Sequence, residues 1–152
     1  MNMTNPPVFQ TKNDLESVLV AVNDSLPLRK IEAMLERTDL SADAKSIALE
    51  VANQTIVVAG QVVRIGRKIV SFAIELAKTI PNTLFGVALA LVMTALIAGI
   101  PVVGALLAGL LKSILLIFGI AQGALADMRR GELGARLENL MAQLMPLRDL
   151  SA

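Results

Sequence analysis

The chain contains no cysteine, histidine, tryptophan or tyrosine. Without cysteine it forms no disulfide and offers no thiolate to a metal ion. Without histidine it lacks the side chain that most often transfers protons near neutral pH. A close pair of carboxylates could replace it, but Glu50 and Glu75 lie far apart on one predicted helix. We therefore predict that the protein is not an enzyme and that it holds no cofactor and no metal ion.

Charge is also scarce, and hydrophobic residues are correspondingly abundant. Charged side chains make up 18% of the 152 residues and the net charge is +1, so no strong field favours a nucleic acid duplex as partner. Hydrophobic residues make up 55% of the chain, and the mean hydropathy of +0.65 is high for a soluble domain. These values predict a membrane protein whose partner is membrane lipid.

The longest apolar stretch lies in the second half of the chain. Residues 79–126 contain a single formal charge, Lys112, which is typical of membrane-spanning segments. The segment Ala98–Pro101 predicts a tight turn in the middle of this stretch. We therefore expect a transmembrane hairpin over residues 81–126. Its two predicted spans are Asn82–Gly99 and Val102–Gln122.

The segments around the hairpin have the pattern of helices with one apolar face. We expect a flexible lead over residues 1–12, short cytoplasmic helices over 13–40, a long amphipathic helix over 41–80 and a C-terminal amphipathic helix over 127–152. Ser41 is the predicted N-cap of the long helix. Leucines at helical spacing precede Pro146, where the last helix should stop. The predicted fold class is all-α, an integral membrane protein with a two-helix transmembrane hairpin between these helices.

Basic residues flank the predicted hairpin on both sides, whereas its turn carries no charge. Those before it are Arg64, Arg67, Lys68 and Lys78, and those after it are Arg129, Arg130 and Arg136. The positive-inside rule places segments rich in Lys and Arg on the cytoplasmic side of a membrane. We therefore expect the protein in the inner membrane of a bacterium, with both termini in the cytoplasm.

The predicted long helix carries a narrow polar stripe on an otherwise apolar surface. Its members are Ser46, Glu50, Asn53, Gln61, Arg64, Arg67, Lys68, Ser71, Glu75 and Lys78, which fall within about 120° of the helix circumference. The stripe could face a lumen, lipid headgroups or another subunit. Within it, Arg64, Arg67 and Lys68 are candidates for binding headgroups or an anionic cytoplasmic ligand. The alternative is that they form a solvated face and a topology signal.

Lys112 lies near the middle of the second predicted span. Burying its charge against lipid costs on the order of 3 kcal/mol, so the side chain needs water or a partner. One interpretation is a ring of Lys112 side chains around an aqueous lumen, with Thr94 and Ser113 as further pore-lining candidates. The other is that Lys112 snorkels to the membrane interface because the span is short or tilted.

Small residues recur at every fourth position in both predicted spans. The helix-packing candidates are Gly86, Ala90, Ala98, Gly104, Ala108, Gly109, Gly119 and Gly123. This spacing lets helix backbones approach closely in lipid, which favours a closed hairpin and contacts between copies. The general richness of membrane helices in small residues is the simpler explanation.

The residues favour a homo-oligomeric channel, because one hairpin is too small to enclose water and about four copies would suffice. The predicted function is an ion channel or pore-forming effector that depolarises or permeabilises the inner membrane. One alternative is a delivered pore-former, whose apolar hairpin hides inside a soluble bundle as in colicin pore-forming domains. The other is a holin-like or structural membrane scaffold without gated conductance.

Part of the hairpin resembles a known family. Over residues 78–122, the motif Ile80–Thr83 before Phe85 and the turn motif Gly99–Gly104 are similar to small bacterial hairpin membrane effectors of anti-phage defence, the Hailong-type membrane effectors. The resemblance implies an oligomeric inner-membrane ion channel. A nucleotide made by a partner nucleotidyltransferase would hold it shut until infection. The resemblance transfers no functional residue to this chain; the basic residues of the polar stripe would be the place to look for the nucleotide.

Overall fold

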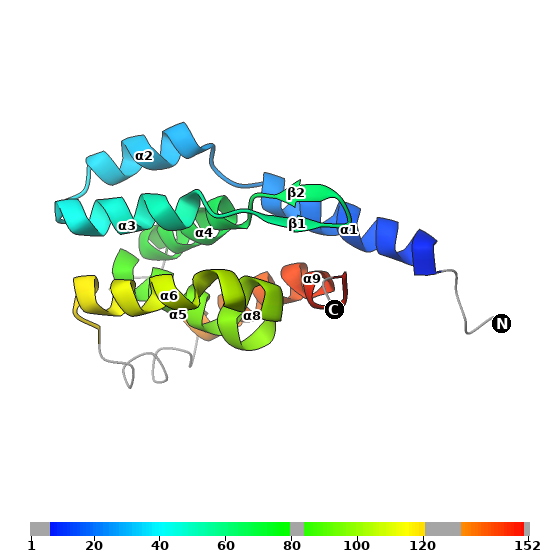
Figure 1. Cartoon of the computed structure of the whole chain (residues 1–152). Helices are drawn as coiled ribbons and strands as arrows, with labels where there is room; N and C mark the ends of the chain where they lie inside the picture. The colour runs from blue at the N-terminus through cyan, green and yellow to red at the C-terminus, as the bar shows by residue number, and fades with distance from the viewer. Residues whose placement is uncertain (1–6, 80–83, 121–131, 151–152) are drawn as a thin grey trace.

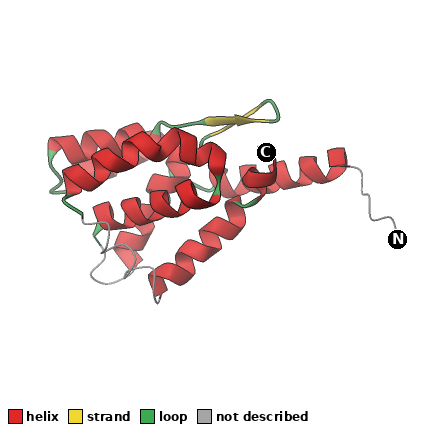
Figure 2. Ribbon diagram, turned by 60° about the horizontal axis from the view of Figure 1, so that its bottom comes forward, coloured by secondary structure: helices red, strands yellow, loops and turns green. Residues whose placement is uncertain are grey.

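A computed structural model describes residues 7–79, 84–120 and 132–150. Its elements are α1 (Pro7–Asn23), α2 (Leu28–Glu36), α3 (Ala42–Ala52), β1 (Ile56–Val58), β2 (Gln61–Val63), α4 (Ile65–Thr79), α5 (Phe85–Gly99), α6 (Pro101–Phe118), α8 (Glu132–Leu144) and α9 (Pro146–Leu150). The predominance of helix confirms the predicted all-α class. In Figure 1, α2, α3 and α4 form one layer, and α5, α6 and α8 form a second. The short β-hairpin lies at the edge of the helical body (Figure 2).

The segment predicted as one long helix over 41–80 is two helices separated by this β-hairpin, so that prediction was wrong. β1 and β2 pair antiparallel with Val57 opposite Val62. The β-branched residues of both strands favour extended backbone. Ala59 and Gly60 between them have positive φ values of 51° and 80°, which suit a tight hairpin turn and exclude a helix. The helical spacing of the polar stripe, which predicts one long helix, does not by itself keep that helix continuous.

The helices α3 and α4 cross closely on either side of the β-hairpin. Ser41 caps α3 as predicted, since its Oγ accepts a hydrogen bond from the backbone N–H of Ala44 at 3.1 Å. The backbone N–H of Gly66 in α4 donates to the carbonyl of Gln54 at 2.9 Å. A side chain at Gly66 would collide with the carbonyl of Val51. The close approach therefore depends on glycine.

The predictions for the two ends of the chain had different outcomes. Residues 7–12, predicted as part of a flexible lead, belong to α1, which begins at Pro7. Proline fits a first helical turn because its missing N–H would have no partner there. The C-terminal helix is present as α8 and ends at Leu144, before Pro146, as predicted. Pro146 then begins the short helix α9.

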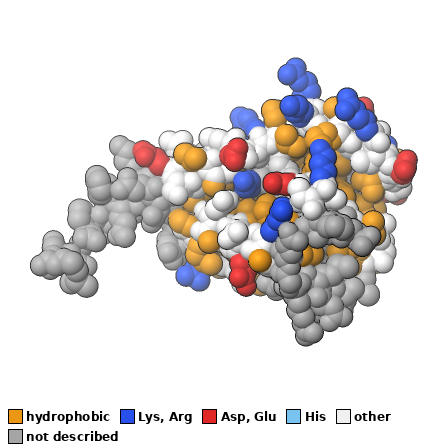
Figure 3. Space-filling model, turned by 180° about the vertical axis from the view of Figure 1, so that it is seen from behind, with side chains coloured by type: hydrophobic (Ala, Val, Ile, Leu, Met, Phe, Trp, Pro, Cys, Tyr) orange, Lys and Arg blue, Asp and Glu red, His pale blue; other side chains and the backbone are white. Residues whose placement is uncertain are grey.

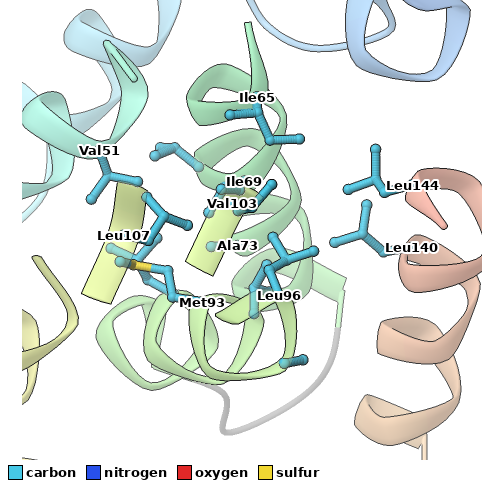
Figure 4. Close-up of a cluster of buried hydrophobic side chains, with 14 of the residues drawn as sticks. Val51, Ile65, Ile69, Ala73, Met93, Leu96, Val103, Leu107, Leu140 and Leu144 are labelled. Atoms are coloured by element: carbon cyan, nitrogen blue, oxygen red, sulfur yellow. The ribbon is translucent and has the colours of Figure 1, made fainter. Parts of the chain in front are cut away.

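Hydrophobic side chains from all the described helices meet in one core. Among the described residues no polar or charged side chain is buried, and the charged side chains lie on the surface (Figure 3). Figure 4 shows the centre of the core, where residues of α3, α4, α5, α6 and α8 converge. Those labelled are Val51, Ile65, Ile69, Ala73, Met93, Leu96, Val103, Leu107, Leu140 and Leu144. The helix α5 therefore lies inside the bundle, and α3 and α4 help to cover the helix pair.

Candidate functional site

The two apolar helices, α5 and α6, pack antiparallel against each other. Ile100 joins them in extended conformation, with φ −131° and ψ 98°. Its N–H donates to the carbonyl of Leu96, and its own carbonyl accepts from the N–H of Gly104, both at 2.9 Å. At the other end of the pair the rings of Phe85 and Phe118 meet edge to face, with centroids 6.3 Å apart. The turn lies where the sequence predicts it.

Both helices are shorter than the predicted spans. The helix α5 begins at Phe85, whereas the prediction started at Asn82, and α6 ends at Phe118 instead of Gln122. Gly119 ends α6 because its φ of 67° is left-handed, a conformation that terminates helices and suits glycine. Asn82 and Gln122 themselves lie outside the described residues.

The helix α5 is covered on its whole circumference. Every side chain from Ala88 to Met93 has 0% exposure, and this run exceeds one helical turn of about 3.6 residues. The hydroxyl of Thr94 on α5 donates a hydrogen bond to the carbonyl of Ala90 in the same helix, at 2.7 Å. A helix that is apolar on all sides needs complete cover, either from protein or from lipid. In this bundle α4, α6 and α8 supply that cover.

The helix α6 has the opposite property, because much of its apolar surface is uncovered. It spans 18 residues with a mean hydropathy of 2.2, enough to cross a membrane, yet only 22% of these residues are buried. Leu116 is 74% exposed and Ile117 is 38% exposed. A core helix of a soluble protein would be mostly covered. By length and composition, α6 is the one candidate span among the described residues, and α5 is a shorter apolar helix.

The predicted pore-lining residues do not converge within one copy of the chain. Lys112 is exposed on the outer side of α6, in line with the exposed Ala108 and Leu116. Ser113 is half-buried on α6, and Thr94 is half-buried on α5. Lys112 is therefore available to a lumen or a headgroup only at the outer face of the pair.

The small residues of the two helices fall into two groups. Gly86 lies directly against the ring of Phe118, and a Cβ on Gly104 would lie 2.8 Å from the carbonyl oxygen of Ile97. These two glycines therefore allow α5 and α6 to approach each other. Ala90 is buried, whereas Ala98, Ala108, Gly109 and Gly119 are exposed. Gly123 lies outside the described residues.

The basic residues of α4 do not form one cluster. Arg64 is exposed just before the helix, and Lys68 is half-buried. The half-buried Arg67 donates from Nε to the carbonyl of Leu26 at 3.1 Å, and the N–H of Leu26 donates to Ser71 Oγ at 2.9 Å. Arg67 and Ser71 thus hold the linker between α1 and α2 on α4. Local sequence patterns carry no signal for this contact, because 41 residues separate Arg67 from Leu26.

This contact predicts different effects for two neighbouring arginines. Arg67→Ala should lower the free energy of unfolding by about 2 kcal/mol, because the Leu26 carbonyl loses a charged donor. Arg64→Ala, at an exposed position, should change it by less than about 0.5 kcal/mol. Urea denaturation of both variants followed by circular dichroism measures the difference. Equal stabilities would show that Arg67 does not hold the linker.

No protein-family model, no curated protein and no solved structure matches this chain. Its function is therefore argued from its own residues. The features to be explained are a fully covered apolar helix, an apolar partner helix with an uncovered face, and basic residues on the helix beside them.

Proposed function

We propose that this chain is a pore-forming membrane protein that keeps its α5–α6 pair in a closed bundle and inserts the pair into a lipid bilayer. The observation that carries the proposal is the apolar, largely uncovered surface of α6. Hydrocarbon would cover that surface, and the backbone groups inside both helices are satisfied within the helices, as a bilayer requires. Of the features left open by the sequence, the covered α5 favours a pore-former whose apolar hairpin is stored in a bundle before it inserts.

Insertion requires α5 to leave α4 and α8, and lipid can replace their contacts. Lipid tails are as apolar as the side chains that now surround α5, so the transfer exchanges one apolar environment for another. The buried face of α4, which includes Ile69, Val70 and Ala73, would then lie at the membrane interface. Arg64, just before this helix, and Lys68 on it provide charges for anionic headgroups. A helix with an apolar face and a basic face is suited to that position.

The lengths of α5 and α6 favour several copies. At 1.5 Å per residue they measure about 22 and 27 Å, against a hydrocarbon layer of about 30 Å. Helices that are too short for a bilayer thin it locally or associate with one another. One pair cannot enclose water, so a homo-oligomer of about four copies would form the pore, with Lys112 around the lumen.

The setting that we propose is the inner membrane of a bacterium, with both termini on the cytoplasmic side. The basic residues that flank the helix pair support this orientation. A role as a phage-defence effector, gated by a nucleotide from a partner nucleotidyltransferase, rests on the resemblance of residues 78–122 to Hailong-type effectors. A membrane scaffold without conductance is the alternative that the first experiment separates from a pore.

The experiment is conductance in planar bilayers, comparing the wild type with Lys112→Glu under an asymmetric salt gradient. We expect discrete conductance steps and a reversal potential that shifts toward cation selectivity in the variant, because the charge at the lumen changes sign. A shift would place Lys112 on the ion path. Well-folded protein that inserts without any conductance would contradict the proposal and favour the scaffold.

A further inference from the structure

Two adjoining cavities lie between α2, α4 and the start of α5. The smaller has a volume of about 180 Å³ and an apolar lining that includes Leu35, Ala77 and Phe85. The larger has a volume of about 550 Å³. Met34, Ile74 and Lys78 line both cavities. The two cavities therefore adjoin at these three residues, with the smaller one as an apolar end and the larger one as a polar end.

Charges of both signs line the polar end. Lys30 and Lys78 supply two cations, and Asp24 and Glu75 supply two carboxylates. Lys78 lies at the junction with the apolar cavity, whereas the two carboxylates line only the larger one. A ligand that leaves the apolar end thus meets a cation first and can meet carboxylates beyond it. A lining with balanced charge suits a headgroup that also carries both charges.

We propose that these cavities bind a single-chain zwitterionic amphiphile, such as a lysophospholipid. Its acyl chain would occupy the apolar cavity, its phosphate would lie near Lys78, and its amine would lie near the carboxylates of Asp24 and Glu75. At about 30 Å³ for a group the size of water, the apolar cavity of 180 Å³ holds about six methylene groups. The remaining chain would lie along Met34 and Ile74. Lys78, which lines both cavities, would thus lie between the chain and the amine of the ligand.

The position of the site also connects it to the helix pair. Phe85 lines the apolar cavity and its ring contacts Phe118 at the far end of α6. An acyl chain in the cavity would thus lie against the residue that closes the open end of the pair. A role of this ligand in releasing α5 and α6 rests on the proposed function, whereas binding itself does not.

The test is isothermal titration calorimetry of the full chain without lipid bilayers, with octylphosphocholine below its critical micelle concentration as the probe. We expect octylphosphocholine to bind at least about tenfold more tightly than phosphocholine, which lacks the chain, and than octyl glucoside, which lacks the charges. Equal binding of octyl glucoside would overturn the assignment of the polar end. If phosphocholine bound as tightly as octylphosphocholine, the assignment of the apolar end to the acyl chain would be wrong.

Two variants and one matched control locate the binding. Ala77→Phe fills the apolar cavity and Lys78→Glu reverses the charge at the junction, so each should weaken binding by about tenfold or more. Lys45→Glu, the same substitution on α3 at a residue that lines neither cavity, should bind as the wild type does. Lys78 is exposed, so its variant remains informative if Ala77→Phe unfolds. Unchanged binding in Lys78→Glu would overturn the proposal, even if the protein forms pores.

Discussion

Tethering Gly99 to Met141 should stop the protein from releasing dye from liposomes. Gly99 ends α5 at the turn, and a Cβ at this position would lie 2.5 Å from Met141 Cε on α8. Insertion of the α5–α6 pair carries the turn across a hydrocarbon layer of about 30 Å. The helix α8 carries charges such as Arg136 and Glu138, which keep it on the side of entry. A link between the turn and α8 therefore prevents crossing.

The chain has no cysteine, so Gly99→Cys with Met141→Cys can be joined specifically by a short bis-maleimide linker that contains a reducible disulfide. Dye release should fall to the level of protein-free liposomes after linking and return after reduction. The two single variants, treated with the same reagent, should remain active. Full release by the linked protein would show that the turn does not cross the bilayer, and the proposed insertion would be wrong.

Gly66→Ala should destabilise the protein more than the same substitution at an exposed glycine of its helices, because Gly66 is buried. The new Cβ would meet the carbonyl of Val51, and it would lie 2.8 Å from the amide nitrogen of Gln54. Backbone atoms cannot move aside as a flexible side chain can, so α3 and α4 must separate. Such overpacking costs about 3 kcal/mol. Urea denaturation followed by circular dichroism measures the loss.

Gly109→Ala is the matched control, because it adds the same methyl group within α6. No atom lies within 4 Å of a Cβ at this exposed position. The substitution should therefore raise the free energy of unfolding by about 1 kcal/mol, the helix propensity of Ala over Gly. If both variants were equally stable, the close crossing of α3 and α4 would be wrong.

Several elements of the fold could be predicted because their signals are local. The turn at Ile100 is marked by a glycine before it and a proline after it, and both act through their own backbone preferences. Ser41 caps α3, and Pro146 marks the stop of α8, for the same reason. The β-hairpin was missed although its signal is local as well. The β-branched residues around Ala59 and Gly60 also fit the apolar face of a helix, so their hydropathy alone does not distinguish a strand from a helix.

The placement of the candidate site could not be predicted, because it depends on contacts between distant segments. The apolar character of α5 requires cover on all sides, but it does not decide whether protein or lipid supplies that cover. The sequence makes Arg67 and Lys68 look equivalent, and only the position of Leu26 gives Arg67 a carbonyl to bind. The sequence likewise predicts Lys112 near the middle of a membrane span. In the bundle, Lys112 lies on the exposed face of α6.

The sequence by itself determined that the chain is helical, that one long stretch has the hydropathy typical of membrane spans, and where that stretch turns. These properties follow from hydropathy and backbone preference, which each residue carries wherever it lies. The tertiary structure alone decided that α5 is enclosed, that α6 keeps an apolar face uncovered, and that an apolar cavity beside Phe85 adjoins a second cavity. Burial is a property of pairs of surfaces, and the surfaces that meet here come from helices far apart in the chain.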